Sequence, residues 1–152
     1  MPHVVVAAIG NPLRGDDGAA WRVAKHAEQH WRGRGVNVLV GQQVLPEWAA
    51  VLADADVVYF VDAARGRATV ALEPLEAAPP QSSTAVTHSF GPANVLRLAA
   101  DLFGGAPEGY LLALPAIEFG FDESLSSIGR RAVSDGIRAL DRALEETLQH
   151  AA

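Results

Sequence analysis

Two adjacent aspartates, a later aspartate and a histidine occupy positions at which they could act together on a metal ion. Asp16 and Asp17 follow a turn, residues 10–15, that begins and ends with glycine. Asp62 directly follows an apolar run, and His88 closes a polar loop. Two carboxylates and one imidazole form an oxygen and nitrogen ligand set that suits a divalent transition metal such as nickel, zinc or copper. Three such ligands leave the metal open to water or to a substrate group.

The glycine turn has the spacing of a phosphate-binding loop but the opposite charge. In a P-loop the second glycine is followed by lysine and then by serine or threonine, which hold the phosphates and magnesium. Asp16 and Asp17 stand at those places, and the glycine pattern of dinucleotide-binding folds is absent from the turn. We therefore do not expect nucleotide binding here. One of the two aspartates can cap the helix that follows, and the other remains for a metal or for general base catalysis.

The elements that would position these side chains follow from the hydrophobic pattern. Apolar runs predict strands at residues 4–9, 36–40, 57–61 and 111–114, with an edge strand at 68–72. Helical periodicity predicts helices from 16 or 17 to 32 and at 46–55, 92–102 and 127–148. Strands that alternate with helices favour an α/β fold, a three-layer α/β/α sandwich with a mostly parallel sheet of about five strands. We expect one domain spanning residues 1–152.

In such a sheet, the carboxyl ends of the parallel strands form a common edge, and ligands bind there. Asp17, Asp62 and His88 are predicted at this edge. Each of them alone could cap a helix or anchor a loop, but their joint placement favours a site. His26 and His30, four residues apart on the first predicted helix, could also chelate a metal. Their polar helix face is instead expected to meet solvent.

Composition restricts the partners and the kind of metal site. The formal net charge of −6 argues against nucleic acid, because affinity for phosphate backbones comes mainly from clustered lysine and arginine. The absence of cysteine excludes disulfides and thiolate ligands from this chain, so any metal must be held by oxygen and nitrogen. The apolar run at 4–9 is too short for a membrane span and lacks a basic leader, which predicts a cytoplasmic protein without a signal peptide.

An ordered set of motifs resembles the maturation endopeptidases of nickel–iron hydrogenases. The set begins with GNPLRGDDG at residues 10–18, continues with Asp62 at the end of an apolar strand, and includes His88 after a polar loop. The segment QQVLPE at 42–47 and the segment from Phe119-Gly120 to Leu125-Ser126 also look like family features. The resemblance spans most of the chain.

The resemblance implies an endopeptidase that removes a C-terminal extension from the hydrogenase large subunit precursor once nickel has been inserted. The positions that match the family's metal-contacting and catalytic residues are Asp17, Asp62 and His88, and Asp16 fits as the neighbouring helix cap. Nickel would arrive in the substrate, which would supply the thiolate ligands that this cysteine-free chain lacks. Hydrolysis would be metal-assisted, with Asp17 or Asp62 assisting proton transfer. We expect the protein to act as a monomer.

Two other functions are compatible with parts of this pattern. Peptidyl-tRNA hydrolases also begin with a strand that runs into Gly-Asn-Pro, but the acidic net charge, the Asp-Asp pair and the lack of a basic track argue against a tRNA substrate. A metal-dependent binding module would use the same residues to recognise a partner without cutting it. Loss of a C-terminal peptide from the nickel-loaded precursor would distinguish the endopeptidase from the binding module.

Overall fold

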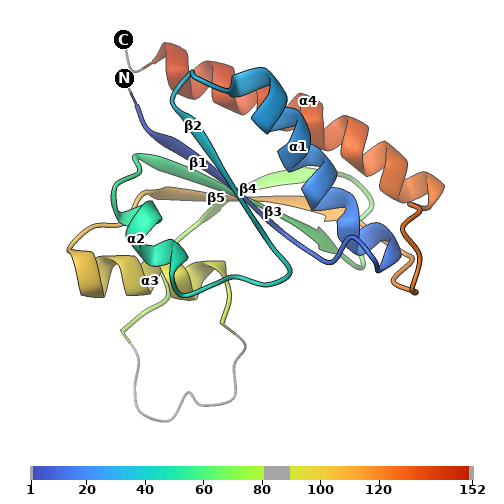
Figure 1. Ribbon diagram of the computed structural model, residues 1–152, viewed down its shortest axis with the longest axis horizontal. Coiled ribbons are helices and arrows are strands. Elements are labelled where there is room, and N and C mark those ends of the chain that lie inside the picture. The colour runs from blue at the N-terminus through green and yellow to red at the C-terminus, as the bar shows by residue number, and fades with distance from the viewer. Residues whose placement is uncertain (1, 81–89, 151–152) are drawn as a thin grey trace.

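A single five-stranded sheet forms the centre of the structure, a computed structural model that describes residues 2–80 and 90–150. The strands are β1 (Val4–Ile9), β2 (Val36–Gly41), β3 (Val57–Ala64), β4 (Ala71–Leu75) and β5 (Glu108–Pro115). Their order across the sheet is β2-β1-β3-β5-β4 (Figure 1). All neighbouring pairs are parallel except β4 and β5, which are antiparallel. The predicted mostly parallel sheet is thereby confirmed.

Helices cover both faces of the sheet. The helices α1 (Ala19–Trp31) and α4 (Ser127–Gln149) lie on one face, and α2 (Trp48–Ala53) and α3 (Pro92–Phe103) lie on the other (Figure 1). A short 3-10 helix, η1 (Gly15–Gly18), precedes α1. The arrangement confirms the predicted α/β/α sandwich. No helix in the described part of the chain is long and apolar enough to cross a membrane.

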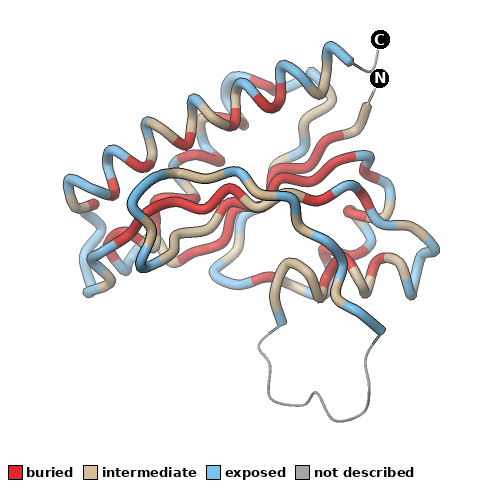
Figure 2. Tube along the Cα trace, turned by 180° about the vertical axis from the view of Figure 1, so that it is seen from behind, coloured by how far each residue is buried: buried red, intermediate tan, exposed pale blue. Residues whose placement is uncertain are grey.

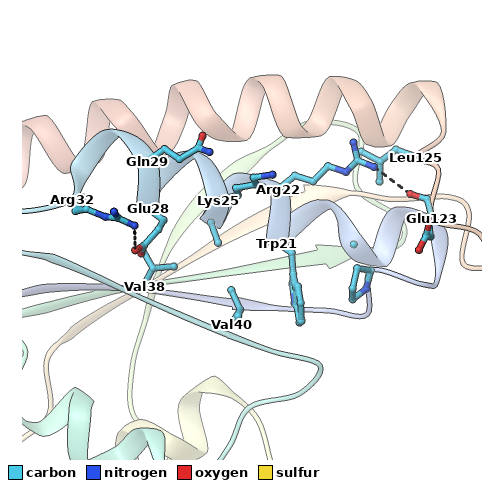
Figure 3. Close-up of a pocket in the computed structure, with 13 residues that line it drawn as sticks. Trp21, Arg22, Lys25, Glu28, Gln29, Arg32, Val38, Val40, Glu123 and Leu125 are labelled. Atoms are coloured by element: carbon cyan, nitrogen blue, oxygen red, sulfur yellow. Dashed lines mark hydrogen bonds and ion pairs between the residues drawn. The ribbon is translucent and has the colours of Figure 1, made fainter.

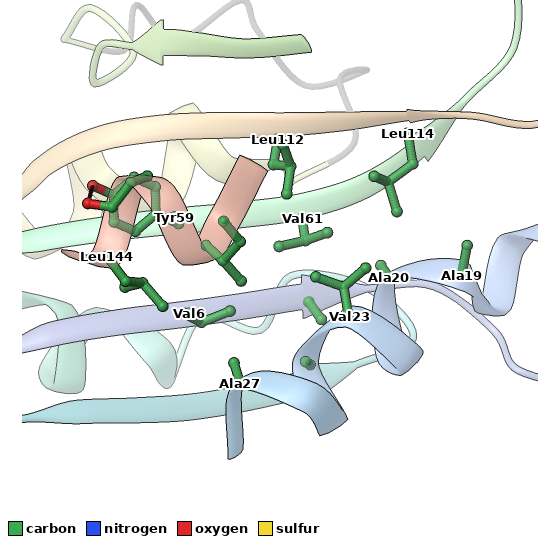
Figure 4. Packing of buried hydrophobic residues seen from close by; sticks show 14 of the residues in the cluster. Val6, Ala19, Ala20, Val23, Ala27, Tyr59, Val61, Leu112, Leu114 and Leu144 are labelled. Carbon is green, nitrogen blue, oxygen red and sulfur yellow. Dashed lines mark hydrogen bonds between the residues drawn. The ribbon is translucent and has the colours of Figure 1, made fainter. Parts of the chain in front are cut away.

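The central strands are buried on both faces, which explains their continuous apolar sequences. Every residue of β1 is buried, and the central strands form the buried middle of the chain in Figure 2. Val4 and Val6 of β1 pack in a cluster with residues of α1 and α4, whereas Val5 and Ala7 pack with residues of α2 and α3. Figure 4 shows the first cluster, in which small side chains of α1 bring this helix close to the sheet.

Several element boundaries differ from those predicted. The edge strand β4 lies at Ala71–Leu75 rather than 68–72, so residues 73–75, which follow the predicted strand, also belong to the sheet. Its Pro74 is tolerated because β4 is an edge strand, where one side needs no backbone donors. Strand β5 begins three residues earlier than 111, and β3 continues to Ala64. Asp62 therefore lies within β3 instead of after it.

Candidate active site

The turn after β1 depends on Gly10, because any other residue at this position would displace the backbone of the turn. Gly10 has a positive φ of 155°, and a Cβ at this position would lie 1.9 Å from the carbonyl oxygen of Asp17. The N–H of Gly10 donates to the carbonyl of Gly41 at the end of β2, at 3.0 Å. This close approach folds the following residues back over the carboxyl end of β1 and places Asp17 there.

Asp17 is held by the backbone of the same turn. Its Oδ2 accepts a hydrogen bond from the N–H of Asn11 at 2.8 Å, and the Asn11 side chain accepts one from the N–H of Leu13 at 2.9 Å. Within residues 2–80 and 90–150, no donor bonds to the other carboxylate oxygen, Oδ1. Asp17 thus has a fixed position and one oxygen available to a metal, a water molecule or a substrate group.

Asp62 lies on the strand next to β1, close to Asp17. In the sheet it pairs with Ile9 of β1 on one side and with Ala113 of β5 on the other. Burial raises the pKa of its carboxyl group to about 6, and the negative charge of Asp17 adds to this increase, while a hydrogen bond from the backbone of Ala63 opposes it. The structure therefore brings two of the predicted site residues, Asp17 and Asp62, together at the carboxyl edge of the sheet.

His88, the third predicted ligand, lies outside the described residues. Among the residues that the structure does describe, no group of three or more histidine, aspartate or glutamate side chains could hold a metal ion. The described part of the candidate site therefore consists of the carboxylates of Asp17 and Asp62. The metal-binding role of Asp17, Asp62 and His88 stays a prediction.

Asp16 does not cap a helix, and this prediction is wrong. Helix α1 has Gly18 at its N-cap, without a side-chain hydrogen bond. The buried carboxylate of Asp16 instead accepts from the N–H groups of Ile117 (2.9 Å), Glu118 (3.0 Å) and Ser126 (2.8 Å), and from the Ser126 hydroxyl (2.7 Å). Burial by itself would raise the pKa of Asp16, but these four hydrogen bonds outweigh it and lower the pKa.

The bonds of Asp16 attach the site turn to the loop that follows β5. Ser126 is the N-cap of α4, and its Oγ also accepts from the N–H of Gly129 at 3.0 Å. The neighbouring Gly15, at a φ of 57°, lies so close to Glu118 that a Cβ would be 2.6 Å from the Glu118 carbonyl oxygen. The N–H of Asp16 donates to that same oxygen at 2.7 Å. The loop and the turn are therefore one packed unit beneath Asp17.

Comparison with solved structures identifies the fold. The structure is similar to the hydrogenase maturating endopeptidase HybD from E. coli, with a TM-score of 0.74 and 19% identity over 95% of this chain and 93% of that chain. It is also similar to the [NiFe] hydrogenase maturation protease HycI from Thermococcus kodakarensis KOD1, with a TM-score of 0.69 and 22% identity over 97% and 93% of the two chains. The chain has the fold of the hydrogenase maturation endopeptidases.

The resemblance predicted from the motifs is thus confirmed at the level of the fold. A third structure, the [NiFe] hydrogenase maturation protease HybD from Thermococcus kodakarensis, matches with a TM-score of 0.70 and 19% identity over 93% of this chain and 98% of that chain. The sequence matches no protein-family model and no curated protein.

In this chain the maturation endopeptidase fold also carries arginine and aromatic side chains beside the site turn. Arg65 comes just after the end of β3, and its guanidinium lies 4.2 Å from the ring centroid of Phe119. Arg14 donates to the carbonyl of Phe119 at 3.3 Å and lies 5.8 Å from the ring centroid of Phe121. Phe121 is 93% exposed. Arg14 and Phe119 lie in segments that the motif comparison already selects, but their pairing with Phe121 and Arg65 leaves no local sequence pattern, because cation–π pairs join distant loops.

His26 and His30 belong to no group of three or more possible metal ligands among the described residues, and His30 is exposed, as predicted, whereas His26 is partly buried. The Nε2 of His26 lies 2.9 Å from the carboxylate of Asp141 on α4, which also accepts from the indole N–H of Trp31 at 2.8 Å. The two imidazole rings stack at a centroid distance of 3.9 Å. The prediction that His26 meets solvent is wrong because α4 packs across this side of α1 and supplies an acidic partner.

Proposed function

We propose that the chain is an endopeptidase that removes the C-terminal extension of a nickel-loaded hydrogenase large subunit precursor. The observation that carries the proposal is the pair of carboxylates, Asp17 and Asp62, at the carboxyl edge of adjacent strands. The fold supports it, because solved structures of this fold carry the names of hydrogenase maturation endopeptidases.

Nickel belongs to the substrate in this proposal. Carboxylate oxygens from Asp17 and Asp62, with the imidazole of His88, would complete the coordination of a nickel ion whose thiolate ligands come from the precursor. The absence of cysteine in this chain agrees with that division of ligands. Bound nickel would polarise the carbonyl of the bond that is cut.

The residues of this chain would position the carboxylates and move the proton. The N–H of Asn11 fixes one oxygen of Asp17, and the other oxygen would be available to the substrate. Asp17 or Asp62 would take a proton from the attacking water and return it to the leaving amine. The C–N bond of the peptide breaks, the oxygen of water joins the carbonyl carbon, and the products are a carboxylate and an amine.

The proposal is tested by incubating the chain with the nickel-loaded precursor and measuring the intact mass of the precursor. We expect the mass to fall by that of a C-terminal peptide, and we expect no cleavage with Asp17→Asn, Asp62→Asn or His88→Ala. The matched control is Asp54→Asn, because Asp54 is exposed near His3, which precedes β1 at the opposite edge of the sheet.

Two outcomes would contradict the endopeptidase. In the first, the precursor binds the chain only when it is loaded with nickel, but its mass does not change. This result would favour a metal-dependent binding module. Cleavage at the wild-type rate by all three site variants would remove the assigned residues from the mechanism.

A further inference from the structure

Strand β2 is an edge strand that lacks the usual protection against pairing. Within the described sheet it pairs only with β1. Its sequence, VNVLVG, contains no charged residue and no proline. Exposed edges in natural proteins normally carry charges or prolines, or are covered, because their unpaired N–H and C=O groups accept a further strand. The other edge strand, β4, shows this protection, since it contains Pro74 and Glu73, the latter paired with Arg67 at 2.7 Å.

Beside β2 lies a groove of about 840 Å³ between this strand and the outer side of α1. Its floor is apolar and is formed by Trp21, Val38 and Val40, as Figure 3 shows. The indole N–H of Trp21 donates to the carbonyl of Gly41 at 3.1 Å, which fixes the ring over the end of β2. Val40 is 46% exposed. The groove therefore offers a preformed apolar surface directly next to the open edge.

The rim of the groove on α1 is basic, although the chain as a whole has a net charge of −6. Arg32 pairs with Glu28 at 3.3 Å, and Arg22 donates to the backbone carbonyl of Glu123 at 3.2 Å. Lys25, between them, makes no ion pair within the part of the chain that the structure describes. A cation in this position attracts an acidic side chain of a partner and repels a basic one.

One end of the groove reaches the candidate active site. Pro12 and Gly18, which belong to the turn that holds Asp17, line this end. From there the groove follows α1, whose 13 residues span about 20 Å. An extended polypeptide rises about 3.3 Å per residue, so about six residues would cover this length.

We propose that β2 and this groove bind an extended segment of the partner polypeptide as an added strand. Alternate side chains of the segment face α1, where apolar ones contact Trp21, Val38 and Val40 and an acidic one lies near Lys25. This inference rests on the proposed function, because the segment is the part of the precursor next to its scissile peptide bond, which would lie at Asp17 of this chain. Recognition by strand addition supplies affinity through the backbone and selectivity through the groove.

The test measures steady-state cleavage of the nickel-loaded precursor by Lys25→Glu and Val40→Glu. Both positions are exposed, so thermal melting should show folded proteins for both variants. We expect KM to rise about tenfold in each variant, with kcat within about twofold of wild type, because ground-state binding is lost and chemistry is not. Arg131→Glu, an equal charge reversal at an exposed position of α4 outside the groove, should leave KM unchanged.

The outcomes separate the two proposals. Wild-type cleavage with an unchanged KM in both groove variants overturns the groove inference and leaves the endopeptidase in place. A loss of kcat without a rise in KM also overturns it, since the groove would then act on the chemistry. If wild type does not cleave the precursor, the proposed function fails and the groove inference fails with it.

Discussion

Asp16 and Ser126, which are 110 positions apart in the sequence, are joined by two hydrogen bonds. The N–H of Ser126 donates to Oδ1 of Asp16 at 2.8 Å, and the hydroxyl donates to Oδ2 at 2.7 Å. Because Ser126 also caps α4, this contact joins the turn beneath the candidate active site to the start of the last helix. Asp16 is thus a structural residue next to Asp17, the carboxylate assigned to the chemistry.

Replacing Asp16 should destabilise the protein more than replacing an exposed aspartate. Asp16→Ala removes the buried acceptor of three backbone N–H groups, which belong to Ile117, Glu118 and Ser126. We expect a loss of at least about 3 kcal/mol in the free energy of unfolding, measured by urea denaturation. The control is Asp101→Ala, which removes an exposed pair with Arg97 and should cost less than about 1 kcal/mol. Equal losses in the two variants would contradict the role of Asp16.

The two carboxylates Asp16 and Asp62 should give opposite dependences of stability on pH. The pKa of Asp16 is lowered in the folded state, so its stabilisation is complete above its ordinary pKa of 3.8 and is lost as the pH falls through the lower folded value. The pKa of Asp62 is raised to about 6, so folded Asp62 keeps its proton to a higher pH than unfolded Asp62 does. Ionised Asp62 therefore lowers the free energy of unfolding as the pH rises from about 4 to about 6.

Asp62→Asn should consequently stabilise the metal-free protein at neutral pH. The gain should reach up to about 3 kcal/mol near pH 7.5 and vanish near pH 4, where the carboxyl group is protonated in the folded state. Urea denaturation of wild type and variant across this pH range measures the difference. A variant that is less stable than wild type at pH 7.5 would show that Asp62 is not penalised by burial and by the charge of Asp17.

Gly10→Ala should disrupt the site turn. The added methyl group would lie 1.9 Å from the carbonyl oxygen of Asp17, in a backbone conformation with positive φ, so the turn must move. We expect a loss of more than about 3 kcal/mol in the free energy of unfolding, together with loss of cleavage. Gly66→Ala is the matched control: Gly66 also has a positive φ, but an added methyl group would meet no atom within 4 Å, so about 1 kcal/mol is expected. Similar effects of both substitutions would argue against the close contact.

Much of the fold could be predicted from the sequence because its main determinants are local. Continuous apolar runs such as 4–9 are typical of strands buried on both faces, and the periodic stripe of α4 identifies a helix that packs on the sheet. The boundaries were less accurate where tertiary contacts decide them. Strand β3 continues through Asp62 because β5 pairs with it as far as Ala64. The sequence of β3 alone does not indicate this pairing.

The candidate site was predicted in part for the same reason. The position of Asp17 and Asp62 at one edge follows from the topology of a parallel sheet, which the sequence pattern indicates. The role of Asp16 could not be found in this way, since its partners Ile117, Glu118 and Ser126 are more than 100 positions away. Ser126 caps the last helix, but nothing local in the sequence indicates that a distant aspartate binds it.

The bond between Asp16 and Ser126 has a consequence for biosynthesis. During translation the turn at 10–18 leaves the ribosome long before Ser126 does, so it lacks its anchor until most of this chain has been made. The attachment of this turn, which includes Asp17, is then completed only after strand β5 has joined the sheet and α4 has begun to form. A nascent or shortened chain without α4 would contain Asp16 but lack its partner Ser126, so the turn that carries Asp17 would not yet be attached to the rest of the fold.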